Sequence, residues 1–346
     1  MKTGTAWRSS NVFRQLLYAK THKKRIPVKV AFQLTKHCNM RCNYCYTDFA
    51  AYKKLGERST RETFEVIDEL YAMGTRWLWF LGGEPMMRDD FGEIIEYSQR
   101  KGIFCDMNSN GTLINEKNVD FVKKLDAVCI SIDGDEASND YYRGKGSYKK
   151  AMAAVKLLRS HDVPVRLHAI LTRKTAESLQ NMAVTAKELG VGFNYCEVLL
   201  SSPDAEDHVL SQDETRAFYE RYRALKTKGY PVLHSERAID YIMKWPKQDG
   251  RVMYKEEVSK YNRDLFVPCL AGDLHCFFDL DGSFYACNGT WNDGLNANEV
   301  GMKKAWDYLA GKKCISCKCI GIVQTNLLFG LRPADIAHGV RHLVKL

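Results

Sequence analysis

Three cysteines, Cys38, Cys42 and Cys45, lie close together with the spacing C-x3-C-x2-C. Three thiolates held this close can bind three irons of a cubane iron–sulfur cluster. The fourth iron is then left without a protein ligand, so it can bind a substrate or a cofactor. We therefore expect a cluster that takes part in chemistry as well as carrying electrons.

The same cysteine triad is compatible with a zinc site and with three unrelated core thiols. Zinc favours paired C-x2-C ligands and needs a fourth ligand. Neither alternative accounts for the further motifs that follow in order along the chain.

The composition is that of a globular protein with unusually many cysteines. The chain has 346 residues and 12 cysteines, and nine of these lie in tight clusters. No signal peptide is present, so we expect reduced thiols that bind metal in the cytoplasm rather than disulfides. No run approaches the ~18 apolar residues of a membrane span. Much of the net charge of +9 lies near the two ends of the chain. Basic ends can bind anionic lipid or an acidic peptide, but they are more often simply solvated. No specific nucleic-acid partner is predicted.

Hydrophobic patterns predict an alternation of strands and helices. Strands are expected at 28–34, 76–81, 103–108, 127–133, 165–171 and 192–199. Helices are expected at 10–20, 60–73, 89–101, 147–160 and 177–189. This alternation predicts a parallel sheet with helices outside it and a site at the carboxyl ends of the strands. The cysteine triad follows the first strand and is placed accordingly.

The segment Gly82-Gly83-Glu84-Pro85 follows the second strand. Glycines let the backbone approach a ligand closely, and a carboxylate can accept hydrogen bonds from an ammonium group. One strand after the cysteine triad, this segment resembles the GGEP motif of the radical S-adenosylmethionine (SAM) superfamily. The resemblance implies a partial (β/α)6 barrel and a [4Fe-4S] cluster whose open iron binds SAM. It also implies reductive cleavage of SAM, hydrogen abstraction by a 5'-deoxyadenosyl radical, and a reductant such as flavodoxin or ferredoxin.

The resemblance further implies a SAM pocket built from several strand ends. The GGEP segment would bind the amino group of SAM, and polar residues after the third and fourth strands would lie near its ribose and carboxylate. The arginine of the segment R-G-x-G-S would bind the SAM carboxylate through its fork of donors. The implied pocket residues are Tyr44, Gly82, Gly83, Glu84, Pro85, Ser109, Asn110, Ser131, Arg143 and Leu171. Leu171 would pack on the adenine, although a leucine at the end of a strand is more often an ordinary core residue.

A second group of cysteines occupies the last 80 residues, around a β-hairpin predicted from Asp281-Gly282. The group resembles the SPASM and twitch extensions, which bind auxiliary [4Fe-4S] clusters. Because a full SPASM domain carries more cysteines, we expect one auxiliary cluster, while two clusters or a zinc knuckle stay open as alternatives. The first-choice ligands are Cys269, Cys287, Cys314 and Cys317. Cys276 and Cys319 are either spare or replace two of them.

Cys196 lies on the sixth predicted strand. In radical SAM epimerases a cysteine thiol returns a hydrogen atom to the substrate radical, so Cys196 is a candidate donor. A free cysteine on a strand is more often a small buried hydrophobe.

We expect five segments along the chain. These are a basic amphipathic segment (1–27), the barrel (28–200), a helical connector (201–265), an auxiliary-cluster domain (266–325) and an amphipathic C-terminal helix (326–346).

The substrate is less well specified, because fold and cofactor do not fix it. The resemblance favours a ribosomally made peptide or protein. The alternatives are a lipid or isoprenoid, with peripheral contact at the inner face of the membrane, and a sugar or aminocyclitol that is oxidised or epimerised. The non-enzyme alternative is an iron–sulfur electron-transfer protein or a zinc-structural protein.

Overall fold

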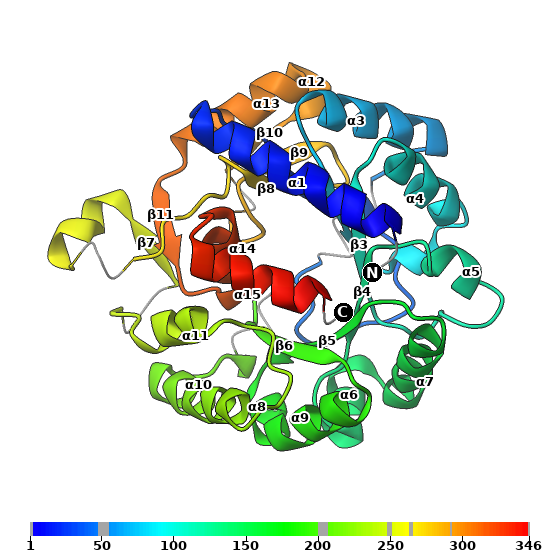
Figure 1. Cartoon of the computed structure of the whole chain (residues 1–346), viewed down its shortest axis with the longest axis vertical. Coiled ribbons are helices and arrows are strands. Elements are labelled where there is room, and N and C mark those ends of the chain that lie inside the picture. The colour runs from blue at the N-terminus through cyan, green and yellow to red at the C-terminus, as the bar shows by residue number, and fades with distance from the viewer. Residues whose placement is uncertain are drawn as a thin grey trace.

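The computed structural model describes residues 3–47, 55–199, 207–247, 251–262, 266–290 and 293–344. Its main sheet has nine strands in the order β10-β9-β8-β1-β2-β3-β4-β5-β6. The sheet curls into a partial barrel, and helices form a ring around it (Figure 1). This arrangement confirms the predicted α/β fold class.

The first six strands are parallel and follow one another in chain order. They are β1 Lys29–Thr35, β2 Trp77–Gly82, β3 Phe104–Ser109, β4 Ala127–Ser131, β5 Val165–Leu171 and β6 Gly192–Glu197. The helices outside them are α3 Thr60–Ala72, α4 Phe91–Arg100, α5 Val119–Val122, α6 Glu136–Arg143, α7 Ser147–Ser160, α8 Arg173–Glu177 and α9 Leu179–Glu188. Helix α3 begins with a capping box between Ser59 and Glu62, which satisfies otherwise unpaired backbone N–H groups.

Burial alternates along the barrel strands. In β5 the side chains of Val165, Leu167 and Ala169 are buried under the helices, whereas Arg166 and His168 keep some exposed surface inside the barrel. Because successive side chains of a strand point to opposite faces, one face builds the core and the other lines the barrel interior.

The C-terminal part continues the same sheet. Helices α10 Gln212–Thr227 and α11 Glu236–Met243 lead to β8 His275–Phe278, which pairs parallel to β1. Strand β9 Ser283–Tyr285 returns antiparallel to β8, which confirms the predicted hairpin, and β10 Gly294–Asn296 forms the edge. The predicted segment boundaries at 200, 201 and 265 lie outside the described residues.

The remaining elements close the open side and the end of the barrel. Helices α12 Ala297–Val300 and α13 Met302–Tyr308 follow β10, and a small sheet pairs β7 Val252–Tyr254 with β11 Cys314–Cys317. Helix α14 Ile320–Phe329 packs against β6, and α15 Pro333–Val344 packs on α14. Side chains beyond residue 339 lie outside the described part, and with them most of the predicted amphipathic face of α15.

The N-terminal helix α1 Thr3–Thr21 crosses the amino ends of the strands (Figure 1). Its residues Val12 and Leu16 pack against Val28 and Phe104, and an ion pair of 2.6 Å joins Arg8 to Asp126. The predicted apolar face is therefore only partly correct. Phe13 and Leu17 point to solvent instead and are 43% and 46% exposed.

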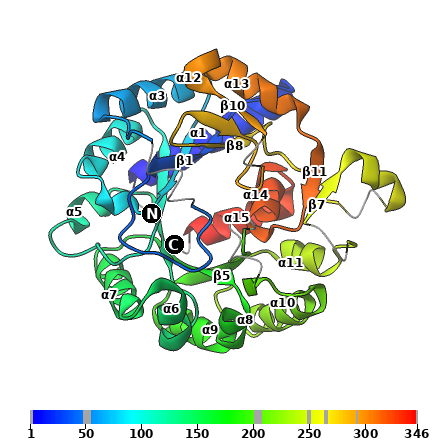
Figure 2. The same ribbon diagram turned by 180° about the vertical axis from the view of Figure 1, so that it is seen from behind.

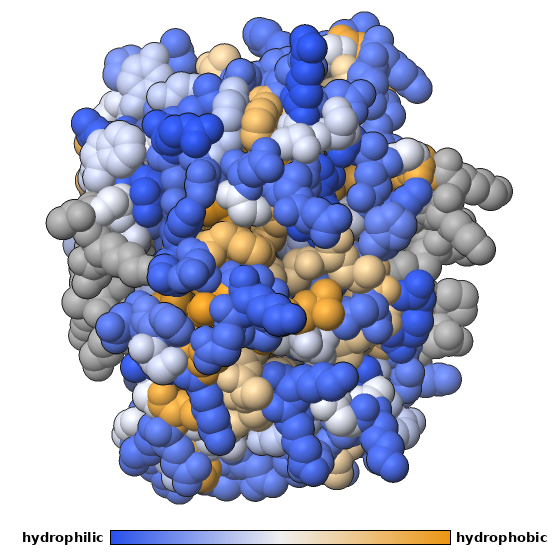
Figure 3. Space-filling view, turned by 90° about the vertical axis from the view of Figure 1, so that its right-hand side faces the viewer, coloured by the Kyte–Doolittle hydropathy of each residue, from blue (hydrophilic) through white to orange (hydrophobic). Residues whose placement is uncertain are grey.

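The described helices include none that is both long enough and apolar enough to cross a membrane. The side of the molecule near α4 and α5 is mainly hydrophilic, with smaller hydrophobic areas between the charged side chains (Figure 3).

Candidate functional site

The cysteine triad lies in a loop directly after β1, on the face opposite α1 (Figures 1 and 2). All three thiols are partly exposed and none forms a disulfide. Cys45 donates its backbone N–H to Cys42 O at 3.0 Å, and the Cys38 sulfur accepts from Met40 N at 3.4 Å. Burial raises the pKa of Cys38 to about 11 and that of Cys42 to about 12. Binding of iron to these thiols must therefore release protons.

The glycines that follow β2 pack directly against this loop. The backbone N–H of Gly83 donates to Thr35 O at 2.8 Å, and that of Glu84 donates to His37 O at 2.7 Å. A Cβ atom added at Gly83 would lie only 2.1 Å from His37 O, and one at Gly82 would lie 2.6 Å from Thr35 O. Only glycine fits at these positions while the cysteine loop keeps its place.

We expect Gly83→Ala to displace the cysteine loop. Overpacking against backbone costs about 1–3 kcal/mol, and the loop is the part that can yield. The variant should retain less iron after reconstitution and should melt at a lower temperature. Gly56→Ala is the matched control, because nothing lies within 4 Å of a Cβ at that position. Unchanged iron content in Gly83→Ala would contradict the packing argument.

Glu84 joins the end of β2 to the end of β3. Its buried carboxylate accepts from Ser109 Oγ at 2.8 Å, from Asn110 N at 2.7 Å and from Met86 N at 3.1 Å. Burial raises the pKa of Glu84 against the lowering effect of these hydrogen bonds. Pro85 is buried and is the first residue of the short 3-10 helix Pro85–Met87.

Asn110 connects β3 to the cysteine loop. Its Nδ2 donates to Asn39 Oδ1 at 2.8 Å, and Asn39 Nδ2 donates to Thr112 Oγ1 at the same distance. Asn39 and Thr112 were not predicted as site residues. Asn39 lies between two of the cysteines, and that position is the signal that could have indicated it.

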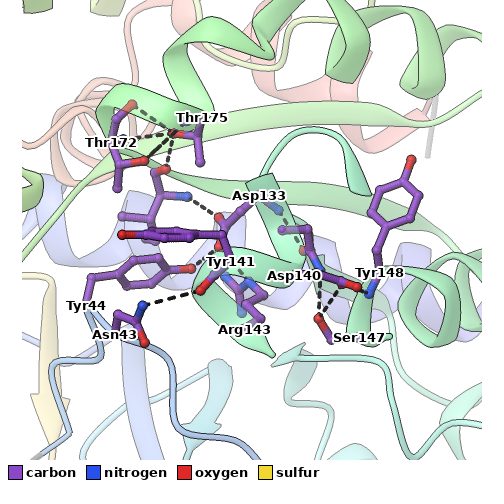
Figure 4. A network of polar contacts seen from close by, with 12 residues as sticks. Asn43, Tyr44, Asp133, Asp140, Tyr141, Arg143, Ser147, Tyr148, Thr172 and Thr175 are labelled. Atoms are coloured by element: carbon purple, nitrogen blue, oxygen red, sulfur yellow. Dashed lines mark hydrogen bonds and ion pairs between the residues drawn. The ribbon is translucent and has the colours of Figure 1, made fainter. Parts of the chain in front are cut away.

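Asp133, just after β4, is the centre of a buried polar network (Figure 4). It is 0% exposed and accepts from Tyr44 OH, from Arg143 Nε at 2.7 Å and from Ile170 N at 2.9 Å. Asp133 does not cap the helix that follows it, because Asp135 is the residue that caps α6. The structure thus brings Tyr44 and Arg143 together through a carboxylate.

The structure does not bring Leu171 to the site. Its side chain is 3% exposed and lies in the main core under the helices, because it is on the outward face of β5. Its neighbour Ile170 has the opposite orientation and packs in a cluster with Tyr44 and Tyr142. Ser131 ends β4 with a partly exposed side chain.

Five of the C-terminal cysteines gather in one region. The Cys269 and Cys314 thiols hydrogen-bond to each other, which lowers the pKa of Cys269 and raises that of Cys314. Cys287, Cys317 and Cys319 line a cavity of about 160 Å³. Glu197 and Arg251 lie in the wall of the same cavity.

Cys276 lies apart from this group. It is on β8, buried in the core beside Val30 of β1, and burial alone raises its pKa. The position of Cys276 on β8 explains why it lies apart from the other cysteines. Consecutive side chains of β8 alternate between the core and the barrel interior, and Cys276 is on the core side. Of the predicted spare cysteines, only Cys319 is placed near the other ligands.

The side chain of Cys196 lies on the inward face of β6, next to α14. A Cβ atom added at Gly321 would lie 2.9 Å from its sulfur, so the glycine makes room for the thiol. Burial raises the pKa of Cys196, and the thiol therefore stays protonated at neutral pH.

Within the described ranges, no three His, Cys, Asp or Glu side chains converge on a single point as they would around one metal ion. A cubane cluster makes a different demand, because each thiolate binds a different iron.

Comparisons with known proteins agree with this geometry. Residues 32–185 match the model of the radical SAM superfamily. An AdoMet-dependent heme synthase of Oleidesulfovibrio alaskensis is 30% identical over 289 residues, which cover 80% of this chain and 74% of the relative. A PqqA peptide cyclase of Gluconobacter oxydans is 28% identical over 170 residues, 48% of each chain.

Solved structures share the fold. Streptococcus suis SuiB bound to its precursor peptide SuiA superposes with a TM-score of 0.64 at 14% identity, over 86% of this chain and 69% of SuiB. On the family match and the 30% identical relative, this chain belongs to the radical SAM superfamily, and it is a radical SAM enzyme whose C-terminal region resembles the SPASM and twitch extensions.

Proposed function

We propose that this enzyme cleaves SAM reductively at a [4Fe-4S] cluster held by Cys38, Cys42 and Cys45, and that the resulting 5'-deoxyadenosyl radical abstracts a hydrogen atom from substrate. One observation carries the proposal. The cysteine loop is packed against the Gly82–Gly83 backbone, beside the buried pair of Asp133 and Arg143.

The residues present fit the cluster and SAM. Three free, partly exposed thiols share one short loop, and the backbone of Gly82 and Gly83 packs so closely against this loop that no side chain would fit between them. When bound, the cluster supplies one electron to the sulfonium of SAM, and an external carrier such as flavodoxin or ferredoxin replaces that electron.

The residues proposed to bind SAM surround this loop. Asp133 holds Arg143 through Nε, and the remaining guanidinium donors suit the carboxylate of SAM. Tyr44, held by the same carboxylate, would lie near the adenine, with Ile170 in the place proposed for Leu171. The backbone of Gly82–Pro85 and the Glu84 carboxylate would bind the amino group, and Ser109, Asn110 and Ser131 would lie near the ribose.

An auxiliary [4Fe-4S] cluster would be bound by four of the five gathered cysteines. Cys269, Cys287, Cys314 and Cys317 are the first choice, and Cys319 is the remaining candidate. Such a cluster beside the barrel can accept the electron that a substrate radical gives up. In an epimerase, Cys196 would be the hydrogen donor, since its protonated thiol faces the barrel interior.

The proposed substrate is a ribosomally made peptide, supported by the relative named as a peptide cyclase. A tetrapyrrole is the second candidate, since the relative that aligns over most of this chain is named a heme synthase.

The direct test is to incubate the reduced, reconstituted protein with SAM and to measure 5'-deoxyadenosine. No product above the level of a protein-free control would refute the proposed chemistry.

The auxiliary site gives a separate prediction. Cys317→Ala should lose the iron of the auxiliary cluster, close to half of the total, because one of its four ligands is gone. Cys276→Ala is the matched control and should keep its iron, since that thiol is buried in the core. Iron analysis and the absorption spectrum measure both. Equal loss of iron in the two variants would contradict this choice of ligands.

A further inference from the structure

The interior of the barrel is lined by polar side chains that retain exposed surface. Register places Lys29 of β1 beside Trp77 of β2, with Trp79 two residues further along. Arg166 of β5 faces the same interior and is 20% exposed. Their outward neighbours Val30, Val165 and Leu167 are fully buried, whereas Lys29 and Arg166 keep some exposed surface toward the barrel interior.

The carboxylate of Asp106, next to Lys29 at the amino end of the barrel interior, is already engaged. Asp106 of β3 is 0% exposed. Its Oδ1 accepts from Trp77 Nε1 at 2.8 Å and its Oδ2 accepts from Arg166 Nη2 at 2.6 Å. One negative charge thus balances the guanidinium, and both carboxylate oxygens have partners.

Lys29 lies next to this pair without a counter-ion of its own. Its Nζ is 4.2 Å from the ring centroid of Trp77 and 4.7 Å from that of Trp79. It makes no hydrogen bond or ion pair with any residue that the structure describes. Burial lowers the pKa of Lys29 to about 8, so the amine is still mostly charged at pH 7.

The two described histidines that face this interior, His275 and His168, do not change this balance of charge. His275 is the cross-strand neighbour of Lys29, and burial lowers its pKa to about 4, so it is neutral. Burial also lowers the pKa of His168. The group formed by Lys29, Arg166 and Asp106 therefore carries one unbalanced positive charge. Contact with two indole rings offsets part of the cost of burying it, and an anion would offset more.

The position of Lys29 sets the length of a suitable ligand. Lys29 begins β1 and Thr35 ends it, which corresponds to about 20 Å along the strand. The cysteine loop follows Thr35, and α1 covers the opposite end of the barrel. The inward side chains of β1 beyond Lys29 are buried, so a ligand that reaches Lys29 from the cysteine side would pass the partly exposed inward side chains of β5 and β6, with another part near the SAM site.

We propose that Lys29, beside the Arg166–Asp106 pair, binds a carboxylate of a substrate that inserts end-on into the barrel. Trp77 and Trp79 contact the apolar part next to that carboxylate. The inference rests on the proposed function, because it takes the barrel interior to be the substrate site. Both candidate substrates can supply the group, as the C-terminus or an acidic side chain of a peptide, or as a side chain of a tetrapyrrole.

The test compares acids with their neutral counterparts. One arm uses coproporphyrin III and its methyl ester, followed by the porphyrin absorption band. The other uses a fluorescein-labelled hexapeptide of alternating alanine and leucine with a free C-terminus, and the same peptide as its amide, followed by anisotropy. The reconstituted wild-type protein should bind the acid at least about tenfold more tightly than the neutral form in the arm that matches the substrate.

Variants assign this preference to Lys29. Lys29→Met should reduce acid binding about tenfold and leave binding of the neutral form unchanged, while Lys29→Arg should keep acid binding within a few-fold. Lys149→Met is the control, because that lysine is 76% exposed on α7.

Two outcomes would overturn the inference: neither acid binds better than its neutral form in the wild type, or Lys29→Met binds the acids as the wild type does. The wild-type comparison needs no variant to fold. SAM cleavage is assayed without these probes, so 5'-deoxyadenosine formation without carboxylate preference refutes the inference alone. Carboxylate preference without SAM cleavage refutes the proposed function alone.

Discussion

Replacing Cys38, Cys42 and Cys45 together by alanine is expected to reduce 5'-deoxyadenosine formation to background. The triple variant should also lose about four irons per chain, while iron at the C-terminal cysteines stays bound. The physical reason is that the three thiolates are the protein ligands of the cluster, so the variant has no side chain left to bind its irons. Iron analysis, absorption spectra and chromatographic detection of 5'-deoxyadenosine measure the result.

The matched control for the triad is Cys105→Ala. Cys105 is a fully buried core thiol on β3, so its removal tests the loss of a cysteine without the loss of a ligand. It should keep both its iron and SAM cleavage, at a cost in stability of about 1 kcal/mol. If the triple variant still cleaves SAM, or if the Cys105 variant loses cleavage while folded, the assignment of the triad is wrong.

Residues that are close in sequence were the easiest part of the site to predict. The cysteine triad lies within eight positions, so its spacing alone indicates shared ligands. The alternation of strands and helices likewise predicted the order of β1 to β6, because each connection is local. The pairing of β8 with β1 could not be read in this way, since about 240 residues separate the two strands.

The phase of side chains along a strand was harder to predict. The resemblance implies Leu171 near the adenine, but Leu171 is an ordinary core leucine, the alternative that the sequence left open, and the inward side chain is that of Ile170, one residue earlier. A shift of one residue reverses the face of every side chain in a strand, and both residues are aliphatic. Cys276 is a similar case. Its spacing suggested a ligand, but its phase on β8 directs it into the core.

Polar networks that join distant segments gave no signal in the sequence. Asp133 binds residues that are 89, 10 and 37 positions away from it. Lys29 is on β1 and Arg166 is on β5, four strands away, and only the curvature of the sheet brings them to one interior. Such sites depend on tertiary structure, and local pattern cannot reveal them.

The network around Asp133 leads to the second large expected effect. We expect Asp133→Asn to weaken SAM binding about a hundredfold and to slow SAM cleavage accordingly. The neutral amide of asparagine cannot form an ion pair with Arg143. The Asp133 carboxylate accepts three hydrogen bonds, and the NH2 group of asparagine would face those donors instead. Removing one partner of a buried ion pair also costs about 3–5 kcal/mol of stability. Equilibrium binding of SAM and thermal unfolding measure the two effects separately.

The chain provides a matched control for this effect in Asp126→Asn. Asp126 is 2% exposed and is likewise paired with an arginine, Arg8, through contacts of 2.6–3.0 Å. It lies at the amino ends of the strands, under α1, so its loss should lower stability by a similar amount and leave SAM affinity unchanged. If both variants lose stability and both keep SAM affinity, Arg143 does not bind SAM. If only Asp133→Asn loses affinity, the carboxylate positions the arginine that binds the cofactor, because the cost to the fold is the same in both.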